Sequence, residues 1–480
     1  MIQKGYINKL CLGCSLLLLF TISTQDIYSQ FSGRSETIAG HQKLAHDIFK
    51  ALIEINTASG NGITRAAEAM AARLKSAGFP ATDIKVIGPD PLRKNLVVRY
   101  PGKGKLRPVL FICHLDVVEA LPRDWSFDPF TFLEKDGYYY GRGTTDVKCE
   151  DADLIANLIR LKQEGYVPNR DIIVALTADE EEGSANGVDW LLVNHRELID
   201  AGFCINPDGG GGEMKNGKNI AMGVQTSEKI YVSFNLEAKN KGGHSSLPTK
   251  DNAIYRLAAG LIRLSNYDFP VMLNETTRKL FEKSAARETG QIKADLLAIL
   301  KDPSDIAAAN RLAAASPYYN SMMRTTCVAT MLNAGHAENA LPQSARAIIN
   351  CRMLPEDNPE SVLSTLKEVI ADTALSFTCT YASFLAPLSP LMDEVMNPVE
   401  RITSSMWPGV NVSPVMSTGA SDGKYLRRAG IPVYGVSGMF GDMDDVRAHG
   451  KDERIGVSQF YEGVEFMYRF IKALTSEEKL

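Results

Sequence analysis

The most informative segment of the chain is an acidic run that follows an apolar one. Residues 171–177 read DIIVALT and lead into Asp179, Glu180, Glu181 and Glu182. Four like charges side by side at the end of a buried strand cost free energy unless cations offset them. Bound metal ions are the simplest source of that compensation, with one carboxylate left to move protons. A solvated surface loop is the alternative, and the other motifs of the chain decide between the two.

Other residues that bind metals follow strand-like segments. His114 and Asp116 stand two positions apart near the end of an apolar run, so both side chains point the same way on a strand. Asp146, Asp208 and His449 lie in the segments GRGTTDVK, NPDGGGG and AHGKDER. The chain has seven histidines, and two of them stand beside carboxylates in this set. Because the carboxyl ends of parallel strands meet at one edge of a sheet, we expect these residues to converge there.

The donor types favour a catalytic metal site. Imidazole and carboxylate ligands without thiolate suit Zn²⁺, with Co²⁺ or Mn²⁺ as alternatives. Five candidate ligand positions suit two metal ions about 3.5–4 Å apart that share one carboxylate. Asp116 would then fix the ring of His114, because ligating histidines usually donate their second N–H to an oxygen. Taken singly, His114 would be a core histidine and Asp208 a turn residue; the ordered set favours metal.

Six motifs in this order, HLDVV, GRGTTDVK, TADEEEGS, NPDG, GGHSSLP and HGKDER, closely resemble those of the M20 metallopeptidase family. That family includes glutamate carboxypeptidase, aminoacylase and succinyl-diaminopimelate desuccinylase relatives. The resemblance spans essentially all of residues 40–475. One departure is Cys149–Glu150 after DVK, where relatives often carry glycines. It predicts a different local loop shape and leaves the ligands unchanged.

The resemblance implies a role for each residue of the metal site. His114, Asp146 and Asp208 would hold one metal ion and bridge to the other, which Glu181 and His449 complete. Glu180 would be the general base, and Asp116 would orient His114. Asp452 and Glu453, which precede the last helix, are interpreted instead as caps of that helix.

A second set of residues implied by the resemblance contacts the substrate. His244, in the glycine-flanked GGHSSLP, would stabilise the oxyanion. Asn339 and Arg352 match positions that contact substrate, and the guanidinium would bind a free carboxylate in a bidentate pair. Gly419, in STGASDGKYL, would approach the substrate through its backbone. A surface strand residue is the alternative for Arg352, and a plain turn is the alternative for Gly419.

The pattern of elements predicts an α/β fold, and the resemblance makes it zinc-peptidase-like. Residues 40–223 alternate helices with apolar strands, which indicates a mostly parallel sheet sandwiched by helices. From residue 224 the strands alternate apolar and polar positions, so residues 224–385 form an inserted α+β lid or dimerisation domain. The segment 266–325 within it is helix-prone and of unassigned role. Residues 386–480 return to the first domain and end in a helix with Phe460, Val464, Met467 and Ile471 on one stripe.

The N-terminus and the composition limit where the protein acts and what it binds. Lys4 and Lys9 precede an apolar run and then a polar one, so residues 1–29 are a predicted signal peptide and the protein is exported, periplasmic or extracellular. The net charge is −5 without a basic block, which argues against nucleic acid and against membrane binding after cleavage. Six cysteines remain after cleavage without a dense framework, and those in apolar runs are expected to be buried free thiols. The six cysteines are Cys113, Cys149, Cys204, Cys327, Cys351 and Cys379.

These expectations describe an exported hydrolase with two Zn²⁺ ions that cleaves an amide next to a free carboxylate. The substrate would be a small peptide or an N-acyl amino acid, and resemblance to dimeric relatives suggests a homodimer through the inserted domain. One alternative is an aminopeptidase on a similar scaffold, against which Arg352 argues. The other is a catalytically inactive exported protein that binds metal or ligand. Glu180 and His244 argue against that alternative, because neither is needed merely to hold metal.

Overall fold

The computed structural model describes residues 40–59, 61–181 and 185–476. The predicted signal peptide and Glu182 of the acidic run lie outside these ranges. Within them, no helix combines the length and the apolar character that crossing a membrane requires.

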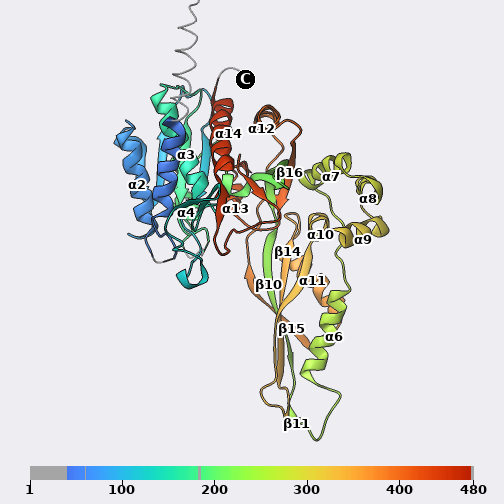
Figure 1. The fold of residues 1–480 in the computed structure, drawn as a ribbon. Coiled ribbons are helices and arrows are strands. Elements are labelled where there is room, and N and C mark those ends of the chain that lie inside the picture. Colours follow the sequence, from blue (N-terminus) through green and yellow to red (C-terminus); the bar gives the residue numbers. More distant parts are fainter. Residues whose placement is uncertain (1–39, 60, 182–184, 477–480) are drawn as a thin grey trace, which may run out of the picture. The chain divides into compact units, whose positions relative to one another are not determined.

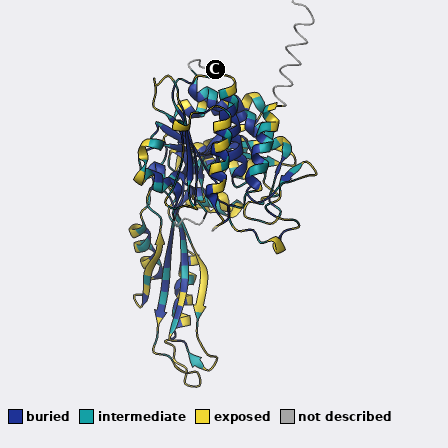
Figure 2. Ribbon diagram, turned by 90° about the vertical axis from the view of Figure 1, so that its left-hand side faces the viewer, coloured by how far each residue is buried: buried dark blue, intermediate teal, exposed yellow. Residues whose placement is uncertain are grey.

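The central sheet has six strands in the order β1-β2-β6-β3-β7-β17. Their bounds are Ile84–Ile87, Asn95–Tyr100, Ile172–Thr177, Val109–His114, Phe203–Ile205 and Val433–Tyr434. Strand β3 runs parallel to β6 and β7, and β17 runs parallel to β7, whereas β2 is antiparallel to both β1 and β6. Every residue of β3 and β6 is buried, and Figure 2 shows the dark blue that marks buried residues in this sheet. The predicted, mostly parallel sheet is confirmed.

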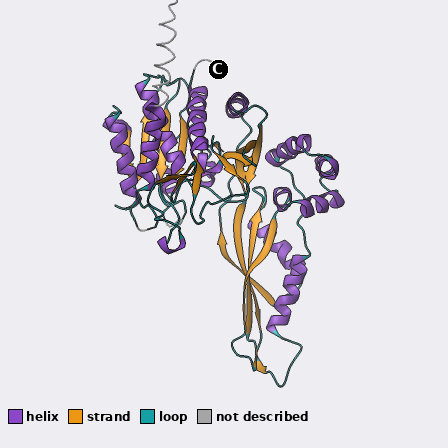
Figure 3. Ribbon diagram, in the orientation of Figure 1, coloured by secondary structure: helices purple, strands orange, loops and turns teal. Residues whose placement is uncertain are grey.

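Helices cover this sheet (Figures 1 and 3). Helices α4 and α13 pack on it through one apolar cluster that includes Ile112, Leu191 and Leu426. Helix α3 packs against β3, and α2 and α14 pack against α3. The helices are α2 (Ile63–Ser76), α3 (Lys148–Gln163), α4 (Gly187–Asn194), α5 (Arg196–Ile199), α13 (Gly423–Arg428) and α14 (Val457–Thr475). The predicted stripe of the last helix is buried.

Two smaller sheets extend the central domain. One has the order β16-β9-β8-β18, with bounds Asn411–Ser417, Lys218–Glu228, Gly211–Lys215 and Phe440–Asp442. The other is β19-β5-β4, with bounds Arg454–Gly456, Tyr138–Tyr140 and Leu133–Lys135. Helix α12 (Asp393–Met406) packs against β16 and α14.

The insertion contains an antiparallel sheet of order β12-β14-β10-β15. Its strands are Thr326–Ala334, Ser344–Met353, Ile230–Lys239 and Leu375–Ala382. Val232, Phe234 and Leu236 of β10 are buried beneath helices α6 (Ala253–Ser265) and α11 (Pro359–Ile370). The alternation in the sequence therefore predicts the buried face correctly. The exact domain limits at residues 224 and 385 remain a prediction.

The segment 266–325 folds into four helices, α7 (Glu275–Arg287), α8 (Gly290–Lys301), α9 (Ile306–Ala315) and α10 (Pro317–Met323). They share their own apolar cluster, which includes Phe281 and Leu296 and extends to Met416 of β16. The hydroxyls of Thr226 in β9 and Thr276 in α7 lie 2.6 Å apart and are buried. The helical module is thus attached to the sheet of β9 and β16.

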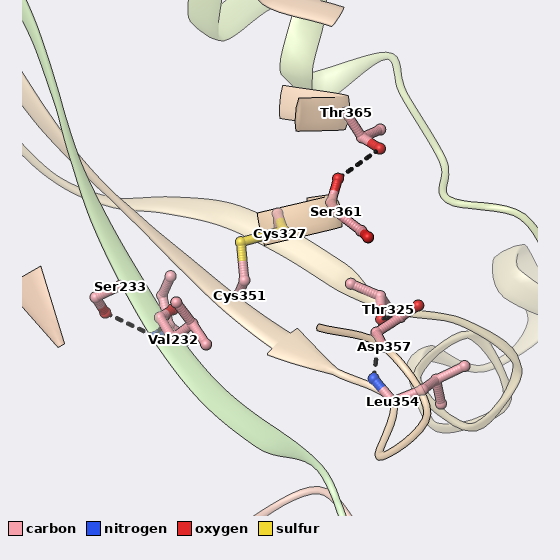
Figure 4. The surroundings of a disulfide bond; sticks show 10 residues. Val232, Ser233, Thr325, Cys327, Cys351, Leu354, Asp357, Ser361 and Thr365 are labelled. Carbon is pink, nitrogen blue, oxygen red and sulfur yellow. Dashed lines mark hydrogen bonds between the residues drawn. A yellow bond between two sulfur atoms is a disulfide. The ribbon is translucent and has the colours of Figure 1, made fainter. Parts of the chain in front are cut away.

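A disulfide joins Cys327 of β12 to Cys351 of β14, which are directly paired across the two strands (Figure 4). The expectation of free thiols is wrong for this pair. Cys351 is buried in its strand, and the register that sets Cys327 opposite it is a property of the sheet that the sequence does not show. Cys113, Cys149 and Cys204 are buried free thiols as predicted, and Cys379 is free and exposed.

Candidate metal centre

The five predicted ligands converge at the carboxyl edge of the central sheet. His114 ends β3, Glu181 follows β6, and Asp208 lies in the short 3-10 turn Pro207–Gly209 after β7. Asp146 precedes α3, and His449 lies between β18 and β19. They form two groups, His114–Asp146–Asp208 and Asp146–Glu181–His449, and the ligand atoms within each group lie within 4.8 Å of one another. Asp146 belongs to both groups, which is the position that a bridging carboxylate requires.

The distances around Asp146 match that position. Its Oδ1 lies 3.1 Å from His114 Nε2, and its Oδ2 lies 3.0 Å from His449 Nε2. His449 Nε2 also lies 2.9 Å from Glu181 Oε1. The two oxygens of one carboxylate therefore face two different imidazoles. This donor set of two imidazoles and three carboxylates fits a pair of Zn²⁺ ions, or of other divalent ions that accept nitrogen and oxygen.

Asp116 contacts both halves of the site. Nδ1 of His114 donates to the backbone carbonyl of Asp116 at 3.0 Å, while the Asp116 carboxylate lies farther from that nitrogen, at 3.8 Å. The carboxylate instead accepts the backbone N–H groups of Glu180, at 3.2 Å, and Glu181, at 3.0 Å. The carbonyl fixes the imidazole, so that Nε2 faces Asp146. The carboxylate positions the start of the acidic run.

The electrostatics of the acidic run follow from its burial. Burial, together with the carboxylates of Asp422 and Asp208, raises the pKa of Glu180 to about 9, although His114 acts in the opposite direction. Burial raises the pKa of Asp208 to about 7. Asp179, directly before Glu180, has φ of 58°, and His449 has φ of 61°. Non-glycine residues rarely adopt this left-handed conformation, and such residues cluster at functional sites.

Glu453 is a residue of the site whose role the sequence interpretation missed. It is fully buried, and its carboxylate pairs with Arg142 Nη1 at 2.7 Å. It also accepts the backbone N–H groups of Gly143, Thr145 and Asp146 at 3.0, 2.7 and 3.1 Å. The expectation that it caps the last helix is wrong, because that helix starts after Gly456 without a side-chain cap. The sequence offers one signal for this role, which is Arg142 inside the GRGTTDVK motif. An arginine that is buried beside the predicted ligands requires an acidic partner.

Asp422 was also not singled out. It is 4% exposed, and its carboxylate lies 3.2 Å from the Thr177 hydroxyl and 2.5 Å from the Asn186 side-chain amide. Thr177 ends β6, and Asn186 caps α4. Asp422 therefore connects the two ends of the segment that carries Glu180 and Glu181.

The residues predicted to contact substrate lie in two separate regions of the structure. His244 lies in β11 (Gly243–His244), which pairs with β13 (Ala340–Leu341), and the N–H of Ser245 donates to the carbonyl of Asn339 at 3.0 Å. His244 Nδ1 accepts the N–H of Ser246 at 3.1 Å, so the second proton site of the ring, Nε2, is left to donate. In the part of the chain that the structure describes, no hydrogen bond or ion pair joins His244 or Asn339 to the candidate metal ligands.

The second region contains Arg352 and Gly419. Arg352 Nη1 donates to the carbonyl of Thr418 at 3.3 Å, and its guanidinium lies 4.6 Å from the ring centre of Tyr231. Among the described residues no carboxylate lies within ion-pair distance of Arg352. Gly419 follows Thr418, and its N–H donates to the Ser417 hydroxyl at 3.1 Å. The structure thus brings two of the predicted substrate contacts together, with one cation unpaired.

The chain is similar to known proteins in sequence and in fold. Residues 110–473 match peptidase family M20/M25/M40. The N-fatty-acyl-amino acid synthase/hydrolase PM20D1 of Bos taurus is 30% identical over 394 residues, which cover 78% of this chain and 75% of that protein.

Two solved structures share the fold. The M20 family metallo-carboxypeptidase Sso-CP2 from Sulfolobus solfataricus superposes with a TM-score of 0.65 at 18% identity, covering 89% of this chain and 98% of that one. The YXEP protein of Bacillus subtilis, described as a dinuclear metal-binding peptidase of the M20 family, gives a TM-score of 0.56 at 11% identity, with coverages of 90% and 98%.

Proposed function

The chain belongs to the M20 peptidase family, and from that premise we propose that it hydrolyses the amide bond of N-acyl amino acids at a centre of two Zn²⁺ ions. The observation that carries the proposal is the pair of ligand groups that share Asp146, with Glu180 directly beside Glu181. His114, Asp146 and Asp208 would hold one ion, and Asp146, Glu181 and His449 the other. Two such ions supply Lewis acidity and lower the pKa of water.

The residues of the chain supply the proton transfer and the orientation. Glu180 takes a proton from the attacking water and delivers it to the leaving nitrogen, which is the work of one buried carboxylate acting as base and then as acid. Burial raises the pKa of Glu180 to about 9 in the metal-free protein, so this carboxylate binds a proton more strongly than an exposed glutamate does. His244, with Nε2 free to donate, stabilises the oxyanion when the inserted domain approaches the site.

The substrate class rests on Arg352 and on the relatives. An unpaired guanidinium beside Thr418 and Gly419 suits the free carboxylate of an amino acid, which it would bind in a bidentate pair. The relative from Bos taurus is named for N-fatty-acyl-amino acids, which carry such a carboxylate. Asn339 would contact the same substrate from the strand beside His244. A small peptide with a free C-terminus presents the same carboxylate and is the second candidate.

The Cys327–Cys351 disulfide supports the prediction that the protein is exported, because disulfides persist in oxidising compartments. Dimerisation through the inserted domain also remains a proposal.

The test uses the purified full chain loaded with zinc. Its kcat/KM is measured on N-acyl amino acids, on dipeptides and on the same compounds with the carboxylate converted to an amide. We expect hydrolysis that requires the free carboxylate, and a Glu180→Gln variant that keeps its bound zinc but loses activity about 10²–10⁴-fold. Equal rates on the acids and the amides would overturn the assignment of Arg352. Full activity of a zinc-loaded Glu180→Gln variant would overturn that of Glu180.

A further inference from the structure

Residues 418–420 form an exposed loop next to a buried anchor. The carbonyl of Thr418 accepts the Arg352 guanidinium, and Gly419 is the next residue. The loop belongs to the central domain, whereas Arg352 belongs to β14 of the insertion. Ser421, directly after the loop, is 3% exposed. A loop binds a ligand in a defined geometry only when neighbouring groups hold it in place, so the groups that hold Ser421 matter for the predicted substrate contacts.

Glu228 holds this end of the loop. It is the last residue of β9 and is 5% exposed. Its Oε2 accepts the backbone N–H of Ser421 at 2.9 Å, the Ser421 hydroxyl at 3.0 Å and the Gln225 side-chain amide at 3.4 Å. Its Oε1 lies 2.7 Å from Nη2 of Arg427, a buried residue of α13. A buried carboxylate costs free energy unless hydrogen bonds and a counter-charge compensate it. No step of the proposed hydrolysis uses this carboxylate.

Lys229, the next residue, connects the loop with the insertion. It stands between β9 and β10, and its backbone N–H donates to the carbonyl of Ser417, just before the loop, at 2.9 Å. Its side chain is buried, and Nζ donates to the carbonyl of Arg324 at 2.7 Å. Arg324 directly follows α10 of the helical segment. The residues that lead from β9 into β10 therefore hold the loop at both ends.

The same junction places the guanidinium of Arg352. Tyr231 is the second residue of β10 and lies opposite Arg352 in the pairing of β10 with β14. The guanidinium lies 4.6 Å from the centre of the Tyr231 ring. The position of this cation relative to the loop is thus determined by the segment 228–231, which contacts both.

We infer that Glu228 is a positioning residue for the substrate carboxylate. By holding Ser421, it keeps residues 418–420 at the place where the loop and Arg352 bind the same carboxylate. The inference rests on the proposed function, because it takes Arg352 as the partner of the free carboxylate. It adds that the affinity for this group depends on a buried residue that acts through the loop.

The experiment measures kcat and KM of the zinc-loaded full chain on N-acyl amino acids. Glu228→Gln keeps the size of the side chain but removes its charge and one of its acceptor oxygens. We expect KM to rise about tenfold and kcat to stay within about twofold, because the contacts that shift bind the ground state and the transition state alike. Asp295→Asn is the matched control, since Asp295 is 2% exposed and pairs with Arg311 at 2.6 Å within helices α8 and α9. It should leave KM unchanged.

A double variant separates positioning from folding. Glu228→Met combined with Arg427→Met removes both charges, and an apolar pair is often as stable as a buried ion pair. Ser421 still lacks its acceptor in this protein, so KM should stay raised about tenfold. A wild-type KM in the double variant would overturn the inference, because Glu228 would then act only through the stability of the fold.

Arg352→Met shows whether both residues act on the same group. In the Arg352→Met protein, Glu228→Gln should raise KM by about threefold or less, because the carboxylate has already lost its charged partner. A tenfold rise in this background as well would mean that the two residues act independently, and the inference would be wrong.

Hydrogen exchange of the metal-free protein gives a readout that does not depend on activity. The Ser421 N–H donates to Glu228, so peptides that cover residues 417–422 should exchange faster in Glu228→Gln than in the wild type. Asp295→Asn should leave the exchange of these peptides unchanged. Wild-type exchange in Glu228→Gln would show that Glu228 does not hold the loop.

The outcomes also separate this inference from the proposed function. A wild-type enzyme that hydrolyses acids and amides at equal rates would refute the role of Arg352, and the role of Glu228 with it. A wild-type enzyme that requires the free carboxylate, together with an unchanged KM in Glu228→Gln, refutes the role of Glu228 alone.

Discussion

Removing the charge of Glu453 should weaken both the fold and the metal centre. The Glu453 carboxylate accepts hydrogen bonds from Arg142, Gly143, Asp146 and, through both its N–H and its hydroxyl, Thr145. Glu453→Gln keeps the shape of the side chain but places an NH₂ group where donors now point. At least one backbone N–H then loses its acceptor, and the buried Arg142 guanidinium loses its counter-charge.

The magnitude follows from these contacts. Breaking a buried ion pair by changing one partner lowers the free energy of unfolding by about 3–5 kcal/mol. Because glutamine keeps one acceptor oxygen, we expect the lower end, about 3 kcal/mol. The same hydrogen bonds fix the loop that ends in Asp146, the residue shared by both ligand groups. Zinc affinity should therefore fall about 10–100-fold, as it does when partners of metal ligands are removed.

Denaturant unfolding of the metal-free protein gives the first quantity, and zinc competition with a chelator gives the second. Asp452→Asn is the matched control, because Asp452 is adjacent in sequence and its carboxylate accepts hydrogen bonds from the N–H and the hydroxyl of Ser126 at the surface. It should change the free energy of unfolding by about 1 kcal/mol or less. A Glu453→Gln variant as stable as the control would refute the anchoring role. Lost stability with unchanged zinc affinity would restrict that role to the fold.

Three further predictions concern the inserted domain and pH. Arg352→Met should lower kcat/KM about 10–100-fold for substrates with a free carboxylate, because it removes a charged hydrogen bond worth about 1.5–3 kcal/mol. It should not change kcat/KM for the corresponding amides. Arg346→Met is the control, because it removes an ion pair with Glu237 at the surface. Replacing Cys327 and Cys351 by serine should lower the free energy of unfolding by about 3 kcal/mol, which is the loop-closure value for a separation of 24 residues. Denaturant unfolding measures this change, and the Cys379→Ser variant is the control, because Cys379 is a free thiol. The metal-free protein should lose stability as pH rises from about 4.5 to 7. Burial raises the pKa of Glu150 and of Asp208 to about 7. Between these pH values the folded state therefore binds more protons than the unfolded state, and stability falls as pH rises. Thermal unfolding across this range checks the sign, and a rise in stability with pH would contradict it.

The candidate metal ligands, which the structure brings together, could be singled out from the sequence because each has a characteristic chemistry and most of them follow an apolar strand. His114 and Glu181 stand directly after runs that read as buried strands, and parallel strands direct their ends to one edge. The alternation in β10 likewise identified its buried face. These are local patterns, and the structure agrees with them.

The supports of the site could not be predicted in the same way. Glu453 contacts residues more than 300 positions away, and Asp422 contacts Thr177 and Asn186 more than 200 positions away. Nothing in the segments KDER or ASDG distinguishes a buried acceptor from a surface charge. The prediction of free thiols at Cys327 and Cys351 was wrong for the same reason, because the strand register decides which residues face each other. The residues that carry the chemistry are defined by type, whereas those that hold them in place are defined by the fold.

The acidic character of the site links its metal binding, its stability and its response to pH. Without cations, burial raises the pKa of Glu180 and Glu181 as well as that of Asp208, so the folded protein takes up protons in place of metal. Binding of divalent metal ions at the proposed centre would release these protons, and metal affinity is therefore expected to rise with pH. Over the same range the metal-free protein becomes less stable, because the raised pKa values favour the protonated folded state. The stabilisation that the proposed metal ions contribute should then grow as pH rises, so that they would provide at neutral pH the charge compensation that protons provide at acidic pH.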